Sequence, residues 1–178
     1  MVGKTHIVGG LALASLLSLS LYKTEFIDEE NLIVQQATLL ASSGLGALLP
    51  DIDHKNSSVS HQAPLVSFFV RLFFTHRGFL HSPLCMLLLT AACYVVAKAV
   101  GSEIGYWIGE GVVIGYASHL LLDSLNPTGI PLFYPYKKKF SFGRVKTGGF
   151  MENMVILSLL GVAIVCEGVL VGVISINT

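Results

Sequence analysis

The sequence predicts an all-α fold: a polytopic bundle of about five transmembrane helices with one short interfacial helix. Three observations predict it: hydrophobic residues make up 53% of the 178 residues, charged residues make up 12%, and the mean hydropathy is +0.71. A soluble domain averages about 25% charged residues, so this chain is short of groups that favour water. The length indicates a single membrane-embedded domain over residues 1–178.

Five apolar segments approach the roughly 20 residues that a helix needs to cross a bilayer. The first resembles a signal peptide, but no small-residue cleavage site stands clearly before the acidic stretch at 25–30, so we interpret it as a membrane helix. The segment 64–74 is shorter and mixes Arg71 with aromatic residues, which favours an amphipathic helix in the interface. The five expected spans are residues 5–22, 31–49, 83–100, 103–125 and 151–176.

Small residues are frequent in these spans. Three GxxxG pairs occur, and such pairs let helix backbones approach closely in lipid. Chance is the alternative for any single pair in a glycine-rich chain. The three cysteines lie inside apolar stretches, which argues against a disulfide framework. The pairs are Gly105 with Gly109, Gly111 with Gly115, and Gly168 with Gly172.

Basic residues predict the orientation. Lys55, Arg71 and Arg77 follow the second span, and five lysines and arginines at 137–146 follow the fourth. The positive-inside rule therefore places the N-terminus and both long loops on the cytoplasmic side of the inner membrane. The charges are few and sum to zero, so no nucleic-acid partner is expected.

Histidines and carboxylates recur at the helix ends on this cytoplasmic face. His119 and Asp123 are four residues apart, which puts both on one face of a helix. Ionisable groups within a membrane span are costly and usually functional. The other helix ends contribute His6, Asp51, Asp53, His54, His76, His81 and Glu152.

Each of these residues also has a structural explanation when it is taken alone. His6 is compatible with an interfacial polar residue, and Asp51 with the end of a helix. The histidines at 76 and 81 are compatible with a loop that faces anionic lipid. Taken together, imidazoles and carboxylates from several helix ends favour a divalent-metal site over a purely structural polar cluster.

Three further charged residues are expected nearer the outer face, at similar depth. They are Lys98, Glu110 and Glu167. We interpret them as a packing cluster of ion pairs, because no further carboxylates or histidines mark the path that a proton relay would need.

At these residues the sequence resembles the YdjM-like family of LexA-regulated, membrane-bound, metal-dependent hydrolases. The matching strings are LPDIDH at 49–54, HRGFLHS at 76–82, SHLLLD at 118–123, NPTG at 126–129, and TG at 147–148 leading to Glu152. The sequence is more distantly similar to zinc-dependent phospholipase C and related single-strand nucleases, through His6, Asp51, His119 and Asp123. The later histidines of that three-metal cluster are missing here, so one or two ions are expected.

The resemblance implies metal-assisted hydrolysis of a phospholipid or another phosphate ester at the cytoplasmic membrane face. The family name also implies regulation in the SOS response. Arg77 is expected to bind a phosphate group through its planar guanidinium. The alternative is that its positive charge anchors the loop at the cytoplasmic membrane surface. Asp53, His54 and Glu152 are expected as further ligands, as residues that orient ligands, or as a general base. The expected ligands of the divalent metal, with zinc as the expected ion, are His6, Asp51, His76, His81, His119 and Asp123.

Two other functional classes are open to a chain with these ligands. One is a transporter or metal-permeation protein, although ligands at one face argue against it because transport sites tend to lie near the bilayer midplane. The other is a membrane scaffold with a structural metal. An enzyme needs an open coordination position, whereas a structural site has a closed ligand shell.

Overall fold

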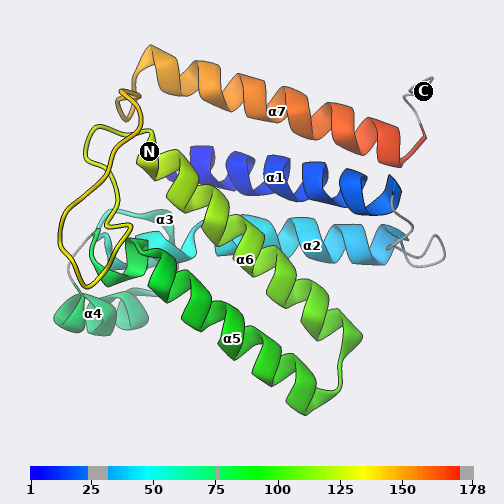
Figure 1. Cartoon of the computed structure of the whole chain (residues 1–178), viewed down its shortest axis with the longest axis horizontal. Helices are drawn as coiled ribbons and strands as arrows, with labels where there is room; N and C mark the ends of the chain where they lie inside the picture. Colours follow the sequence, from blue (N-terminus) through cyan, green and yellow to red (C-terminus); the bar gives the residue numbers. More distant parts are fainter. Residues whose placement is uncertain (24–31, 75–76, 173–178) are drawn as a thin grey trace.

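The computed structural model describes residues 1–23, 32–74 and 77–172 (Figure 1). In these ranges the regular elements are helices, apart from one isolated antiparallel bridge between Ile130 and Phe140. The all-α class is therefore confirmed. The long helices are α1 (Gly3–Lys23), α2 (Leu32–Gly46), α5 (Pro83–Val100), α6 (Glu103–Ser124) and α7 (Phe150–Leu170); the short ones are η2 (Leu49–Asp53), α3 (Ser58–Gln62), α4 (Pro64–Phe73) and η3 (Phe79–His81).

Successive long helices run in opposite directions, so their starts alternate between the two ends of the bundle (Figure 1). α1 packs between α7 and α2, α6 crosses α1 and α2, and α5 packs on α6. The starts of α1, α5 and α7 and the ends of α2 and α6 consequently meet at one end, on the left in Figure 1. We call this the loop end, because the short helices and the long connection before α7 lie there.

Four helices are long and apolar enough to cross a membrane: α1, α2 with its continuation to Asp53, α5 and α7. The fifth expected span, α6, has 22 residues, roughly 33 Å of helix, but it is more polar because it carries Glu103, Glu110 and Asp123. Neighbouring helices cover its inner face, and Asp123 is buried there. Protein, rather than lipid, therefore surrounds that carboxylate.

The turn between α5 and α6 shows how the sequence sets the helix ends. At the start of α5, the Ser82 hydroxyl caps the helix by accepting a hydrogen bond from the backbone N–H of Cys85, with proline next at the first helical position. α5 ends at Gly101, whose φ of 66° is left-handed. Ser102 then caps α6 by accepting from the N–H of Gly105. The two helices therefore form a tight hairpin.

Glycines permit a close contact between α2 and α6. A Cβ atom on Gly115 would collide with the backbone carbonyl of Ser43, and one on Gly111 would collide with that of Leu39. This GxxxG pair therefore has a packing role, as the sequence suggests. By contrast, Gly172 lies beyond the end of α7 with nothing within 4 Å of an added Cβ.

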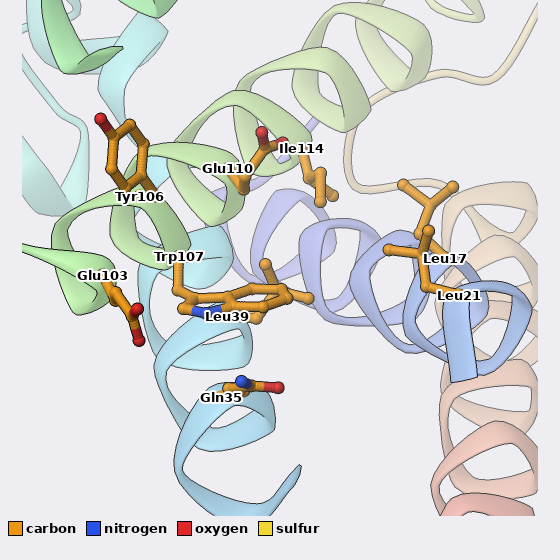
Figure 2. Close-up of a pocket in the computed structure, with 9 residues that line it drawn as sticks. All are labelled: Leu17, Leu21, Gln35, Leu39, Glu103, Tyr106, Trp107, Glu110 and Ile114. Carbon is orange, nitrogen blue, oxygen red and sulfur yellow. The ribbon is translucent and has the colours of Figure 1, made fainter. Parts of the chain in front are cut away.

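A cavity of about 570 Å³ lies among α1, α2 and α6, away from the loop end (Figure 2). Leucine side chains from α1 and α2 form its apolar wall, and Trp107 lies across it. Glu103 and Glu110 reach it from α6. None of the histidines in the described ranges lines it.

Candidate metal site

Five of the expected ligands lie together at the loop end. Two groups have ligand atoms within 4.8 Å of one another, and His119 belongs to both. Every member is buried except Asp51, which is partly exposed. We call the five residues the His/Asp cluster: His6, Asp51, His81, His119 and Asp123. That they bind a metal stays a prediction.

His119 is held so that one ring nitrogen faces the cluster. Its Nδ1 lies 2.7 Å from the backbone carbonyl oxygen of Ala47, at the end of α2. A carbonyl only accepts hydrogen bonds, so Nδ1 carries the hydrogen and Nε2 presents a lone pair. This arrangement is typical of metal-binding histidines, whose second nitrogen is fixed by an outer partner. Nothing in the sequence marks Ala47 for this role.

The distances inside the cluster match a coordination shell. His119 Nε2 lies 3.3 Å from His81 Nε2. His81 Nε2 lies 3.6 Å from an Asp51 oxygen and 3.7 Å from an Asp123 oxygen. Two nitrogens bound tetrahedrally to zinc at about 2.05 Å would be separated by about 3.3 Å. The histidine nitrogens and aspartate oxygens are therefore spaced closely enough to act as ligands of one ion.

Asp53 lies behind His81 rather than inside the cluster. Its Oδ2 is 3.7 Å from His81 Nδ1, and both side chains are fully buried. The opposite ring nitrogen, Nε2, points to Asp51 and Asp123. Asp53 is therefore placed to orient the His81 ring, which is one of the roles expected for it.

His6 provides the clearest test of whether these residues fit a metal. Its ring stacks on His119 with centroids 3.7 Å apart. Both ring nitrogens are buried, and neither makes a hydrogen bond within the described chain, although Nε2 lies 3.5 Å from an Asp123 oxygen. Leaving a buried polar atom without a partner costs about 1–3 kcal/mol, and a bound ion would remove that cost. The residues therefore fit a divalent metal.

Arg77 closes the cluster at its edge. Its Nη2 lies 3.0 Å from Asp123 Oδ2, while the other oxygen of Asp123 lies 2.8 Å from the amino group of Met1. Arg77 has a φ of 55°, a left-handed conformation that is uncommon for residues other than glycine and is often found at ligand clamps. Its Nη1 is buried and makes no hydrogen bond to the described residues.

Glu152 lies near the cluster, but hydrogen bonds to other residues engage its carboxylate. Its carboxylate accepts hydrogen bonds from the N–H of Val2, the hydroxyl of Thr5 and the N–H of Gly148. These bonds join the start of α7 to the start of α1, directly before His6. Glu152 is therefore placed to position His6, and Thr5 is a partner that the sequence patterns did not single out.

One other expected site residue that the structure describes, His54, is not part of the cluster. His54 is half-buried and closes the loop after η2, where its N–H donates to the Asp51 carbonyl and its carbonyl accepts from Ser57 and Ser60. It belongs to neither group of close ligand atoms. His76 lies outside the described residues.

The motif residues at 126–129 have a structural role. Asn126 accepts from the N–H and the hydroxyl of Thr128 and donates to the Thr147 hydroxyl at 2.8 Å. The connection between α6 and α7 is thereby folded back, so that Glu152 reaches α1.

The fold and the cluster together define a polytopic helical membrane protein whose helix ends gather buried histidines and aspartates. The sequence profile of the family described as YdjM inner membrane protein matches residues 1–177. The chain therefore belongs to the YdjM family of inner membrane proteins.

Relatives of known sequence agree with this assignment. The chain is 35% identical over 163 residues to the uncharacterized protein YvsG of Bacillus subtilis (strain 168). This match covers 89% of this chain and 89% of that protein. It is 33% identical over 127 residues to the inner membrane protein YdjM of Escherichia coli (strain K12), covering 68% of this chain and 62% of that protein. The YdjM protein of Shigella flexneri matches equally. No solved structure matches the chain significantly.

Proposed function

We propose that this protein is a membrane-embedded, metal-dependent hydrolase that cleaves a lipid or another phosphate ester at the cytoplasmic face. The observation that carries the proposal is the facing pair of His81 and His119 Nε2 atoms, 3.3 Å apart, with aspartate oxygens beside them. Nitrogen and carboxylate ligands in this mixture are those that zinc prefers, and one or two ions fit the cluster.

The residues supply what a phosphoester hydrolase needs. When bound, a divalent ion activates water and stabilises charge on a phosphoryl oxygen. Asp53 orients His81, and the Ala47 carbonyl orients His119. Arg77 Nη1 is available to donate to a phosphate oxygen. In the reaction, the oxygen of water bonds to phosphorus, the ester P–O bond breaks, and the leaving alcohol takes up a proton.

The geometry favours an enzyme over the alternatives. The cluster lies at one end of the bundle, whereas a transport site tends to lie near its middle. Asp51, at its edge, is partly exposed, so water and substrate have a route to the ligands. A structural metal in a scaffold would have no need of such an opening.

Metal analysis followed by a hydrolysis screen tests the proposal. We expect purified protein in mild detergent to contain one or two equivalents of zinc and to hydrolyse members of a panel of soluble and lipid phosphate esters. Chelation should abolish hydrolysis, and added zinc should restore it. Stoichiometric zinc without hydrolysis of any ester would instead identify a structural metal, and protein without metal would refute the site.

Orientation is tested separately by cysteine labelling. In a variant lacking the native cysteines, a cysteine at Ser141 should be labelled from the cytoplasm, because the loop that carries it is rich in lysine. A cysteine at Glu103, at the other end of α6, should be labelled from outside. Reversed labelling would place the cluster on the outer face.

A further inference from the structure

A second pocket is lined by Arg77, the residue that pairs with Asp123 of the His/Asp cluster. It encloses about 340 Å³ between the end of α4, residues 77–79 and the connection between α6 and α7. We propose that this pocket binds the phosphate headgroup of an anionic lipid without an ammonium group, and that α4 guides this lipid from the bilayer. The inference rests on the proposed function for the fate of the lipid, but lipid binding is measurable by itself.

The charges that line the pocket all have one sign. Arg77, Lys137 and Lys139 line it, and none of the described aspartates or glutamates does. A zwitterionic headgroup would bring an ammonium group that needs an acceptor, whereas a phosphate monoester brings only acceptors. The lining therefore selects an anionic headgroup over a zwitterionic one.

Arg77 connects this pocket to the cluster. One of its terminal nitrogens, Nη2, is held by Asp123 at 3.0 Å. The other, Nη1, is buried without a hydrogen bond in the described chain. Because the guanidinium group is a planar fork, a phosphate that receives the Nη1 hydrogen bond lies beside the Asp123 end of the cluster. A headgroup in this pocket is thus placed next to the metal ligands.

Aromatic side chains favour a lipid over free phosphate. Phe79 stacks on Phe74 with ring centroids 5.3 Å apart and meets Tyr134 edge-on at 5.4 Å. All three rings line the pocket. They offer apolar surface to the glycerol and the first methylene groups of a lipid, and an inorganic ion would leave this surface without a partner.

α4 supplies a route from the bilayer to this pocket. It lies on the outside of the bundle at the loop end (Figure 1). Its polar side faces the protein: Ser67 donates to the Ile52 carbonyl at 2.7 Å, and Arg71 donates to Ser67. Its outward side is apolar, which is the reverse of a helix on a soluble protein and fits the membrane interface. The outward residues, with their exposed fractions, are Leu65 at 75%, Phe69 at 58%, Leu72 at 60% and Phe73 at 78%.

The end of this apolar surface coincides with the pocket. Phe73 is the last residue of α4 and also lines the pocket. The Ile52 carbonyl, which accepts the hydrogen bond from Ser67 of α4, lies between Asp51 and Asp53 in the chain. This bond therefore links α4 to the segment that carries these two aspartates. A lipid whose chains lie along α4 can therefore present its phosphate to Arg77.

Binding of a short-chain lipid phosphate tests the inference. The probe is dihexanoyl phosphatidic acid, titrated by calorimetry into full-length protein in non-ionic detergent. We expect the double variant Lys137→Gln/Lys139→Gln to bind it at least about tenfold more weakly, since hydrogen bonds to charged groups are lost. The control, Lys138→Gln/Lys146→Gln, removes the same charge from the same loop. Lys138 lies over the Phe140 ring and, like Lys146, does not line the pocket.

The outcomes separate this inference from the proposed function. Selective loss in the pocket variant supports the inference, even if no ester is hydrolysed and the proposed function fails. Equal losses in both double variants would overturn it, even if hydrolysis is found. Binding of dihexanoyl phosphatidylcholine or of inorganic phosphate as tight as that of the lipid phosphate would also overturn it.

Discussion

The bundle carries polar side chains between its helices at both ends, and their polar atoms have different partners at the two ends. Away from the loop end, Glu167 accepts a hydrogen bond from Gln36 at 2.5 Å, between α7 and α2. Glu110 accepts one from the Tyr94 hydroxyl at 2.9 Å, between α6 and α5. Each acceptor there meets a donor on a neighbouring helix, so both glutamates pack as expected, but these partners are neutral side chains rather than the ion pairs predicted.

At the loop end, some polar atoms have no such partner. Asp123 is paired with the Met1 amino group and with Arg77. Both ring nitrogens of the buried His6, however, lack a hydrogen bond among the described residues, and the Nε2 atoms of His81 and His119 face each other at 3.3 Å. A bound cation would satisfy these nitrogens. The larger cavity belongs to the other end (Figure 2). Cavity volume is therefore a weaker indicator of the functional site here than the matching of hydrogen-bond donors and acceptors.

The largest expected effect is from removing a cluster ligand. His119→Ala should lower zinc content and hydrolysis by more than about 100-fold, the upper end of what the loss of an outer partner costs. Measurement is by elemental analysis and ester hydrolysis. His61→Ala is the matched control, since His61 is exposed and its ring contacts only the Ser57 carbonyl among the interactions described. Unchanged zinc content in His119→Ala would contradict the proposal that the loop end binds metal while the other end only packs.

Replacing the residue behind a ligand should have an intermediate effect. Asp53→Asn should weaken zinc affinity by about 10–100-fold, because the amide no longer orients His81 with a negative charge. Competition with a chelator measures this affinity. Glu110→Gln, the same chemical change at the other end, should leave it unaltered. Equal affinities for both variants would contradict the orienting role.

A smaller effect is expected at the contact between α2 and α6, which joins the two ends. Gly115→Ala should lower the free energy of unfolding by about 1–3 kcal/mol, because the methyl group meets the Ser43 carbonyl. Detergent-based thermal unfolding measures the change. Gly161→Ala on α7, where nothing lies within 4 Å, should be neutral or slightly stabilising. A tolerated Gly115→Ala would show that the helices can separate at no cost.

The smallest effect should come from Glu167. Glu167→Gln keeps an oxygen that accepts from Gln36, so hydrolysis and zinc content should stay near those of the unmodified chain. Glu167→Ala should cost about 0.5–1.5 kcal/mol of stability by removing the bond. Complete loss of hydrolysis in a well-folded Glu167→Gln would move this residue into the functional machinery.

Much of the arrangement at the loop end could be predicted from local patterns. Apolar runs of span length fix the alternation of helix ends, and a spacing of four puts His119 and Asp123 on one face. Since consecutive spans must reverse direction, residues at alternate ends of consecutive helices must share one side. His6, Asp51 and His81 could therefore be assigned to one end before their side-chain contacts were known.

Tertiary packing decided the roles within that end, because those roles depend on partners far along the chain. The His119 ring is oriented by Ala47, 72 residues away, and Glu152 reaches Thr5 across 147 residues. The backbone carbonyl of Ala47 carries no sequence signal, and Glu152 reaches Val2 and Thr5 only because the connection before α7 folds back. Sequence alone thus determined that these histidines and aspartates share one end of the bundle. Packing determined which atoms face one another, since hydrogen bonds and ion pairs are set over a few ångströms that no local period specifies.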